Sequence, residues 1–166
     1  MVLFLRILVA FYSFEGNTKF IAEAIAKELK ANLLELKPTK DVKSKGFFKY
    51  PIGGAQVVFG FKPKLLPFDK NPEDYDVLFL GTPTWSLSYT PSMRSFLSRA
   101  KLASKKIGLF CCRMGNKGKT FKIMRRKLKG NEIIGEIDFS QPLIKAKEED
   151  AKTAQKWAKE LVSKIS

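Results

Sequence analysis

The chain has 166 residues and an apolar content typical of globular proteins, so we expect one folded domain over residues 1–166. It contains no histidine, and its two cysteines, Cys111 and Cys112, are adjacent. These features exclude a disulfide framework, a zinc site and a nucleophile activated by an imidazole base. The formal net charge of +15 favours acidic or polyanionic partners.

The N-terminal residues predict a soluble, cytoplasmic protein that does not attach to a membrane. The first apolar run is too short to span a bilayer and is interrupted by Arg6. No small-residue cleavage site follows it, so we expect an unprocessed chain.

The stretch from Ile7 to Thr18 predicts a buried strand, a turn and the start of a helix. An uninterrupted apolar run is typical of a parallel strand buried on both faces. The first amides of the following helix have no intrahelical partner and would attract an anion, with added donors from Ser13 and Thr18. The alternative is that Asn17 or Thr18 simply caps an ordinary helix. Helical spacing continues at Phe20, Ile21, Ala24, Ile25 and Leu29.

The middle of the chain predicts two further strands and two helices. Asn32 to Leu36 is a short strand, and Asp76 to Gly81 is a third buried strand. Between them we expect a short helix near residues 45–58, weakened by its glycines. A loop from Thr82 to Tyr89 then leads into a helix opened by Pro91.

The C-terminal third continues the alternation of strand and helix. Lys106 to Cys112 is a fourth strand, followed by a loop at residues 111–119. A very basic helix at about 119–129 precedes a fifth strand from Ile133 to Phe139. The last helix covers about residues 147–165 and opens with acidic side chains, which suit a helix N-terminus.

Strands that alternate with helices predict an α/β fold, with a parallel sheet covered by helices on both faces. In such sheets ligands bind beyond the carboxyl ends of the strands. Three loops leave those ends, at residues 13–18, 82–90 and 111–119. The first loop offers hydrogen-bond donors for a phosphate, and the second offers the rings of Trp85 and Tyr89. The third loop is open. A phosphorylated ligand with a flat aromatic ring would suit all three.

Two of these loops resemble those of a known family. The turn Ser13-x-x-Gly16-Asn17-Thr18 resembles the phosphate loop of flavodoxins. The segment Gly81-Thr82-Pro83-Thr84-Trp85 is similar to the second flavin loop of flavodoxin-like proteins, in particular archaeal and bacterial ones with a G-T-P-x-W loop. The resemblance implies a flavodoxin-like three-layer α/β/α sandwich whose five-stranded parallel sheet has the order 2-1-3-4-5.

The same resemblance implies FMN as the cofactor. Its phosphate would bind the first loop, and its isoalloxazine ring would contact the two later loops. Two features depart from the family: this chain is basic, and its third loop lacks the aromatic residue that often stacks on the flavin. The implied FMN-binding residues are Ser13, Glu15, Gly16, Asn17, Thr18, Thr82, Pro83, Thr84, Trp85, Cys111, Cys112, Arg113, Met114 and Gly115.

Two of these motifs also have a purely structural interpretation. Trp85 could pack over the end of the sheet without touching a ligand. Cys111 and Cys112 could be small buried side chains instead of a reactive or disulfide-bonded pair.

The basic segment after the fourth strand raises two further hypotheses. Gly118-Lys119-Thr120 resembles the end of a nucleoside-triphosphate loop, but Arg113 stands where that pattern needs its first glycine. The run of basic residues from Arg113 to Gly130 resembles a nucleic-acid patch. Because its one aromatic residue is Phe121, we expect a solvated helix face and no nucleic-acid partner.

Three classes of function remain. The first is an FMN-binding electron-transfer protein with an acidic redox protein as its partner. The second is an NAD(P)H-dependent flavin or quinone oxidoreductase, in which Arg113 and Lys117 would meet the phosphates of the nicotinamide nucleotide. The third is a flavin-free binding protein that uses its basic surface. The sequence favours the electron carrier, because apart from the flavin loops it has no dinucleotide-binding motif such as G-x-G-x-x-G.

Overall fold

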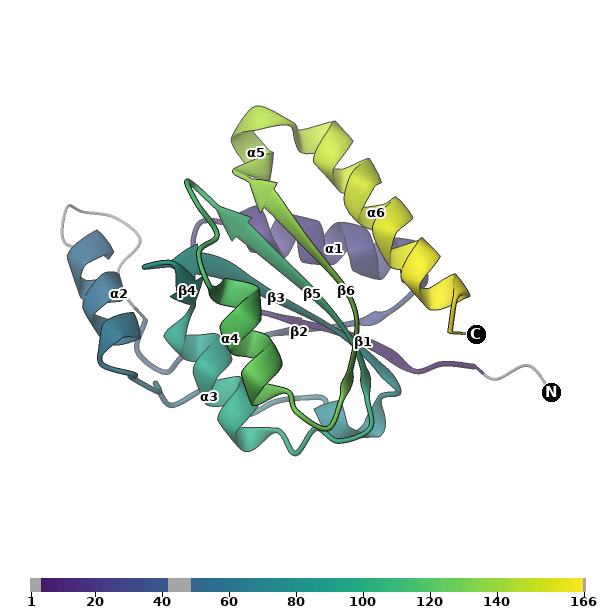
Figure 1. Cartoon of the computed structure of the whole chain (residues 1–166), viewed down its shortest axis with the longest axis horizontal. Coiled ribbons are helices and arrows are strands. Elements are labelled where there is room, and N and C mark those ends of the chain that lie inside the picture. The colour runs from purple at the N-terminus through teal and green to yellow at the C-terminus, as the bar shows by residue number, and fades with distance from the viewer. Residues whose placement is uncertain (1–3, 42–48, 166) are drawn as a thin grey trace.

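Parallel strands form the centre of the protein, whose structure is a computed structural model that describes residues 4–41 and 49–165 (Figure 1). The strands are β1 (Ile7–Phe11), β2 (Asn32–Glu35), β3 (Val77–Trp85), β4 (Ser88–Tyr89), β5 (Lys106–Arg113) and β6 (Glu132–Ser140). Across the sheet the order is β2-β1-β3-β5-β6, and β4 pairs antiparallel with the end of β3. Counted along the chain, the parallel strands have the order 2-1-3-4-5, which confirms the prediction.

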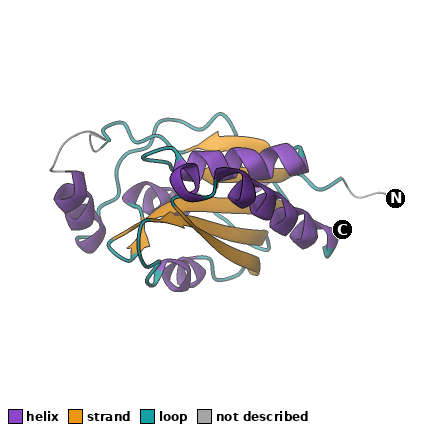
Figure 2. Cartoon of the chain, turned by 90° about the horizontal axis from the view of Figure 1, so that it is seen from above, coloured by secondary structure: helices purple, strands orange, loops and turns teal. Residues whose placement is uncertain are grey.

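Helices cover both faces of the sheet, as Figure 2 shows from above. One face carries α1 (Asn17–Leu29) and α6 (Lys147–Ser163), and the other carries α3 (Pro91–Arg99) and α4 (Thr120–Lys127). The predicted three-layer sandwich is therefore confirmed. The remaining helices are α2 (Lys49–Val58), which packs beyond the carboxyl end of β3, the short α5 (Pro142–Lys145) and a 3-10 turn (Pro72–Asp74).

The strands are buried on both faces because neighbouring residues alternate between two apolar cores. In β1, Leu8 and Ala10 belong to the core beneath α3 and α4, whereas Val9 and Phe11 belong to the core beneath α1 and α6. All four side chains are at most 2% exposed. Burying a large apolar side chain stabilises a protein by about 1.5–3 kcal/mol. The strand that leads into the first predicted ligand loop is therefore among the most firmly held elements.

The helix α1 turns a slightly different face to the core than the spacing predicts. Ile21 and Ile25 are fully buried as expected, but Ala22 and Ala26 complete the buried face. Phe20, Ala24 and Leu29 are partly buried along its edges. Small alanine side chains allow close packing against the sheet, which a count of large apolar residues does not reveal.

The segment predicted as a loop from Thr82 to Tyr89 is a β-hairpin. β3 continues to Trp85, and the chain returns through Ser86 and Leu87 into β4. Both turn residues have positive φ, at 47° and 61°. Two-residue hairpins of this kind usually contain Asn-Gly or Asp-Gly, so Ser-Leu gave no recognisable turn signal.

One predicted helix is described only in part, and one short helix was not predicted. The helix expected near residues 45–58 is present as α2, while residues 45–48 lie outside the described residues. The short α5 was not predicted, although Pro142 at its first position is a common helix-opening residue. Four residues are too few to show helical periodicity in a sequence.

Candidate functional site

A cavity of about 380 Å³ lies at the carboxyl ends of β1, β3 and β5, where the three predicted loops meet. All the residues assigned to FMN by resemblance line it except Gly16, Thr82 and Cys111. The lining residues are Ser13, Phe14, Glu15, Asn17, Thr18, Gly53, Gly54, Pro83, Thr84, Trp85, Ser86, Leu87, Cys112, Arg113, Met114, Gly115, Asn116 and Gln141.

The first loop presents the start of α1 to the cavity. Gly16 is the N-cap, with a left-handed φ of 94° and no side-chain cap. The Ser13 hydroxyl accepts a hydrogen bond from the backbone N–H of Lys19 at 3.1 Å, and Oδ1 of Asn17 accepts one from the backbone N–H of Leu143 at 3.0 Å. Neither Asn17 nor Thr18 is therefore the cap of an ordinary helix. Their own amides lie in the first turn, where no intrahelical acceptor exists.

Thr18 is the least satisfied polar residue of this loop. Its side chain is 1% exposed, and its Oγ1 has no hydrogen-bond partner among the described residues. The thiol of Cys112 lies beside it, but a thiol is a weak acceptor. A buried hydroxyl without a strong partner costs about 1–3 kcal/mol. This cost is recovered if a ligand in the cavity accepts the hydrogen bond.

Trp85 both packs and lines the cavity, so its two sequence-based interpretations are compatible. Its indole meets the rings of Tyr12 and Phe14 edge to face, with centroids 5.8 Å and 5.2 Å away. On α2, a Cβ added to Gly53 would lie 3.2 Å from Cε3 of the indole. The helix backbone can thus approach the ring closely because this position is glycine.

Helix α2 is held beside the second loop by Arg94 of α3. Both terminal nitrogens of Arg94 donate to the carbonyl oxygen of Val57, at 3.2 Å and 3.3 Å. The same guanidinium lies 5.5 Å from the ring centroid of Tyr89. Arg94 therefore connects α2, α3 and β4 next to the cavity.

Thr82 and Cys111 lie behind the cavity wall. The Thr82 hydroxyl is buried, lies 3.0 Å from the Thr90 hydroxyl and accepts a hydrogen bond from the backbone N–H of Thr90 at 3.2 Å. This contact joins the two strands at the base of the hairpin. Cys111 is fully buried in the core beneath α3 and α4.

The two cysteines point to opposite faces of the sheet. Cys112 belongs to the core beneath α1 and α6, opposite to Cys111, and both thiols are free. Burial raises the pKa of both thiols, that of Cys111 to about 11. Both therefore stay protonated at neutral pH. The structure supports small buried side chains and not a reactive or disulfide-bonded pair.

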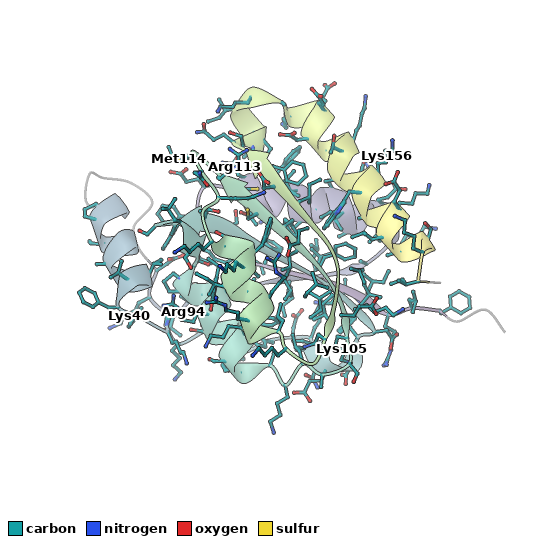
Figure 3. All side chains as sticks on the ribbon, in the orientation of Figure 1. Lys40, Arg94, Lys105, Arg113, Met114 and Lys156 are labelled. Carbon is teal, nitrogen blue, oxygen red and sulfur yellow. The ribbon has the colours of Figure 1, made fainter. Side chains whose placement is uncertain are left out.

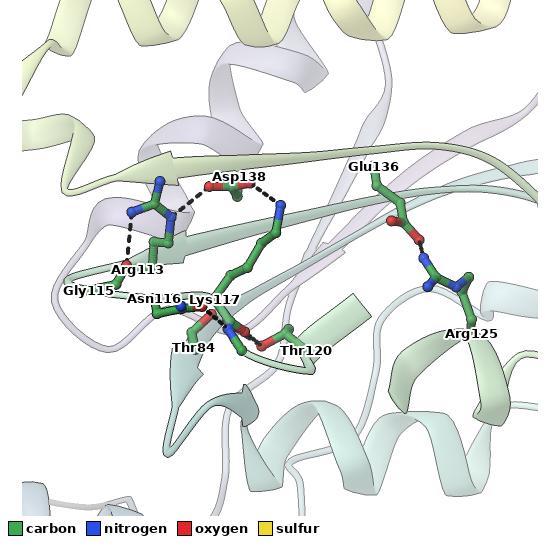
Figure 4. A network of polar contacts seen from close by, with 10 residues as sticks. Thr84, Arg113, Gly115, Asn116, Lys117, Thr120, Arg125, Glu136 and Asp138 are labelled. Carbon is green, nitrogen blue, oxygen red and sulfur yellow. Dashed lines mark hydrogen bonds and ion pairs between the residues drawn. The ribbon is translucent and has the colours of Figure 1, made fainter. Parts of the chain in front are cut away.

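The third loop carries an ion-pair network that sequence analysis missed (Figure 4). Nε of Arg113 donates to Asp138 at 2.6 Å, and Nζ of Lys117 donates to the other carboxylate oxygen at 2.7 Å. Nη1 of Arg113 also donates to the carbonyl oxygen of Gly115 at 2.8 Å. Asp138 is on β6, and its role depends on its register with β5, which the sequence does not show.

The segment Gly118-Lys119-Thr120 supports the hairpin. A Cβ at Gly118 would lie 2.3 Å from Cβ of Leu87, and the backbone N–H of Lys119 donates to the carbonyl oxygen of Leu87 at 2.9 Å. The tight turn therefore serves packing and not a triphosphate. The basic residues of α4 are exposed, and Arg125 pairs with Glu136 (Figure 4), as expected for a solvated helix face.

Seven lining residues were not assigned by the resemblance. Four of them lie inside the predicted ligand loops, so the sequence indicated that they are near the cavity but gave them no role: Phe14, Ser86, Leu87 and Asn116. Adjacent glycines within a predicted helix indicate a close backbone approach, which is a signal for Gly53 and Gly54. Gln141 has a left-handed φ of 49° and carried no signal in the sequence.

The described residues contain no group of three or more Cys, Asp or Glu side chains placed to hold a metal ion. Within residues 4–41 and 49–165, no helix combines the length and the apolar character needed to cross a membrane.

No protein-family model matches the chain. Among solved structures it is similar to a flavoprotein from Lactobacillus acidophilus NCFM in complex with FMN, at 23% identity and a TM-score of 0.70 over 81% of this chain and 93% of that one. It is also similar to flavodoxin 2 from Bacillus cereus, at 21% identity and a TM-score of 0.60 over 96% and 99% of the two chains. A flavodoxin, WrbA-like protein from Agrobacterium tumefaciens matches at 16% identity and a TM-score of 0.66 over 96% of each chain. These similarities confirm the predicted flavodoxin-like fold.

Proposed function

We propose that the cavity binds FMN and that the protein carries electrons between other proteins. The observation that carries this proposal is the buried, unpaired hydroxyl of Thr18 at the start of α1. A phosphate oxygen would accept its hydrogen bond, and the first amides and the dipole of a 13-residue helix would add to the attraction. The similar Lactobacillus flavoprotein holds FMN in its crystal structure.

The rest of the cavity suits a flat ring. Trp85 and Met114 provide apolar surface on the second and third loops, and Gly53 and Gly54 keep the wall formed by α2 free of side chains. Contact with an aromatic ring contributes about 0.5–1.5 kcal/mol beyond burial. When bound, FMN supplies reversible transfer of one or two electrons. The residues of this chain would hold its phosphate, orient its ring and exclude water.

The phosphate site is tested by Thr18→Val, which keeps the shape of the side chain and removes its hydroxyl. We expect the binding free energy of FMN to weaken by about 1.5–3 kcal/mol, the value of a hydrogen bond to a charged group. The affinity for riboflavin, which has no phosphate, should not change. Fluorescence titration of both flavins measures the difference.

A matched control is Thr153→Val, because Thr153 is exposed on α6, remote from the lining residues. It should bind FMN as the wild type does. Equal affinity of the wild type for FMN and riboflavin would contradict a phosphate site at α1. A purified protein that is colourless and binds neither flavin would support the third class, a flavin-free binding protein.

An NAD(P)H-dependent flavin or quinone oxidoreductase is the second candidate. Arg113 and Lys117 bring two cations to the edge of the cavity, and such cations recognise phosphates. Both are already paired with Asp138, which favours the electron carrier. Oxidation of NAD(P)H by the FMN-loaded protein with a quinone acceptor would decide for the oxidoreductase.

We infer that the redox partner is an acidic protein that contacts α2. Residues 42–68 contain lysines but no acidic residue. At the end of α2, Val58 is 73% exposed and Phe59 is 85% exposed, close to the exposed Lys62 and Lys64 in the chain. An apolar centre beside positive charges suits an acidic surface with apolar side chains. Because α2 also lines the cavity through Gly53, such a partner would come close to the cofactor.

A further inference from the structure

Two cations at the rim of the cavity share a single carboxylate. Nε of Arg113 is 2.6 Å from Oδ2 of Asp138, and Nζ of Lys117 is 2.7 Å from Oδ1 (Figure 4). Because Arg113 also donates to the carbonyl oxygen of Gly115, its guanidinium is held on two sides. Of these residues, Arg113 and Gly115 line the cavity.

Asp138 is firmly placed between these cations. Its backbone is in register with Cys111, so the pairing of β5 and β6 fixes its position. Its side chain is 18% exposed, compared with 31% for Arg113 and 47% for Lys117. Burial would raise the pKa of Asp138, but hydrogen bonds from Lys117 and Arg113 outweigh this effect and lower the pKa. The carboxylate is therefore ionised at neutral pH.

This carboxylate accepts hydrogen bonds from Arg113 and Lys117 that a phosphate could accept instead. Arginine and lysine recognise carboxylates and phosphates through the same charge-assisted hydrogen bonds. A phosphorylated ligand reaching for Arg113 would have to displace Asp138 or lie next to its negative charge. Displacement would leave a partly buried carboxylate without its two partners, which is unfavourable.

We propose that Asp138 is a specificity-determining residue that fills this anion site from within and so excludes a second phosphorylated ligand, such as a nicotinamide dinucleotide, from the cavity rim. The inference deepens the proposed function and rests on it for the presence of FMN in the cavity. It also explains why two cations beside a flavin cavity need not indicate NAD(P)H binding.

The decisive variant is Asp138→Asn, which keeps the size of the side chain and removes its charge. Inorganic pyrophosphate is the probe, and calorimetry measures its dissociation constant for the FMN-loaded and the flavin-free protein. We expect Asp138→Asn to bind pyrophosphate about tenfold more tightly than the wild type, or better, as one added contact of about 1.4 kcal/mol would give. Adding Arg113→Gln to Asp138→Asn should remove this gain.

The matched control is Glu136→Gln. Glu136 lies on β6, as Asp138 does, and the variant also removes one negative charge. The partner of Glu136, however, is Arg125 of α4. The affinity of Glu136→Gln for pyrophosphate should stay within about twofold of the wild type, since distant exposed charges are screened. An equal gain in both variants would mean that net charge acts and Asp138 has no special place. No gain in Asp138→Asn would also overturn the proposal.

A second measurement does not depend on the folding of Asp138→Asn. In the otherwise wild-type protein, Arg113→Gln and Lys117→Gln should leave pyrophosphate binding unchanged, because Asp138 already occupies these cations. Weaker binding in either variant would show that the cations are free to bind an anion and would overturn the proposal. If the wild-type protein binds no FMN, the proposed function fails, and the comparison among flavin-free variants still tests Asp138.

Discussion

At the scale of single residues, the cavity joins a polar end and an apolar end. Thr18 offers a hydroxyl that lacks a strong partner, on the first turn of α1. Trp85 offers an indole whose orientation is set by its edge-to-face contacts with Tyr12 and Phe14. Phosphorylated flavins have the same division between a charged end and a flat ring, which is why these two residues together favour FMN.

Trp85 should report on bound FMN through its fluorescence. The chain has two tryptophans, and the other, Trp157, lies on α6 with its ring centroid 5.5 Å from that of Phe79 in the opposite core. We expect Trp85→Phe to remove most of the quenching that FMN causes, because a ring in contact with the flavin is quenched most strongly. Trp157→Phe should leave the quenched fraction unchanged or raise it. The reverse pattern in a fluorescence titration would place the flavin away from Trp85.

Asp138 should make the stability of the protein depend on pH in the acid range. The hydrogen bonds from Lys117 and Arg113 lower the pKa of Asp138 in the folded state despite its burial. Its stabilising contribution is therefore complete above the unfolded pKa of about 3.9 and is lost as the pH falls through the folded pKa. We expect Asp138→Asn to flatten this part of the profile, measured as the urea midpoint between about pH 5 and pH 2. A variant with the same acid profile as the wild type would show that the network contributes nothing to stability.

At the scale of elements, the hairpin of β3 and β4 forms one wall of the cavity at a cost in backbone strain. Ser86 and Leu87 are consecutive non-glycine residues with φ of 47° and 61°. The left-handed conformation costs roughly 1–2 kcal/mol for such residues. The contact of Lys119 and Gly118 with Leu87 opposes this strain and holds the turn in place.

Replacing Leu87 with glycine should therefore stabilise the protein. The relief of strain exceeds the added entropy of the unfolded chain, about 0.5–1 kcal/mol, so we expect a net gain of roughly 0.5–1 kcal/mol. Urea unfolding of the flavin-free protein measures it. Gly118→Ala is the opposing control and should destabilise, because its Cβ would lie 2.3 Å from that of Leu87 and its φ is +56°. Destabilisation by Leu87→Gly would mean that the Leu87 side chain matters more than the turn conformation.

At the scale of the whole molecule, positive charge is spread widely, and some acidic residues each pair with two cations. Glu35 is close to both Lys19 and Lys37, and Asp138 holds two further cations. In the view of Figure 3, Lys40 and Arg94 lie near one another, and Lys105 and Lys156 lie on other parts of the molecule. A net charge of +15 creates a field that attracts acidic partners at separations of up to about 8 Å, the Debye length at physiological ionic strength.

Electron transfer with an acidic redox protein should slow steeply as salt is added. Steering of the encounter is screened over a Debye length of about 8 Å at physiological ionic strength. Stopped-flow rates should fall further in Lys62→Glu with Lys64→Glu, the lysines that follow α2, than in Lys152→Glu with Lys156→Glu on α6, which changes the net charge equally (Figure 3). A rate that ignores ionic strength, or equal losses in both variants, would contradict docking at α2.

The sequence by itself determined the architecture of this protein and the end of the sheet at which its cavity lies. Buried strands are continuous apolar runs, and right-handed crossovers place them in one sheet with their carboxyl ends together. These are local or topological properties, so the parallel sheet and the convergence of residues 13–18, 82–90 and 111–119 could be predicted from them, whereas the strand order was implied by the resemblance to flavodoxins. Because they lie in these loops, Thr18 and Trp85 could be placed near the cavity without knowledge of their contacts.

Only the tertiary structure decided which side chains meet within that cavity. The pairing of Asp138 with Arg113 depends on the register of β6 against β5, which includes an irregularity between Ile107 and Gly108. The approach of Gly53 to Trp85 depends on where α2 docks, and Arg94 of another helix helps to set that. Such contacts join residues far apart in the chain, and their energies depend on distances of a few ångströms. Periodicity and motif spacing contain no information at that precision, so the ion-pair network beside this cavity could not be predicted from them.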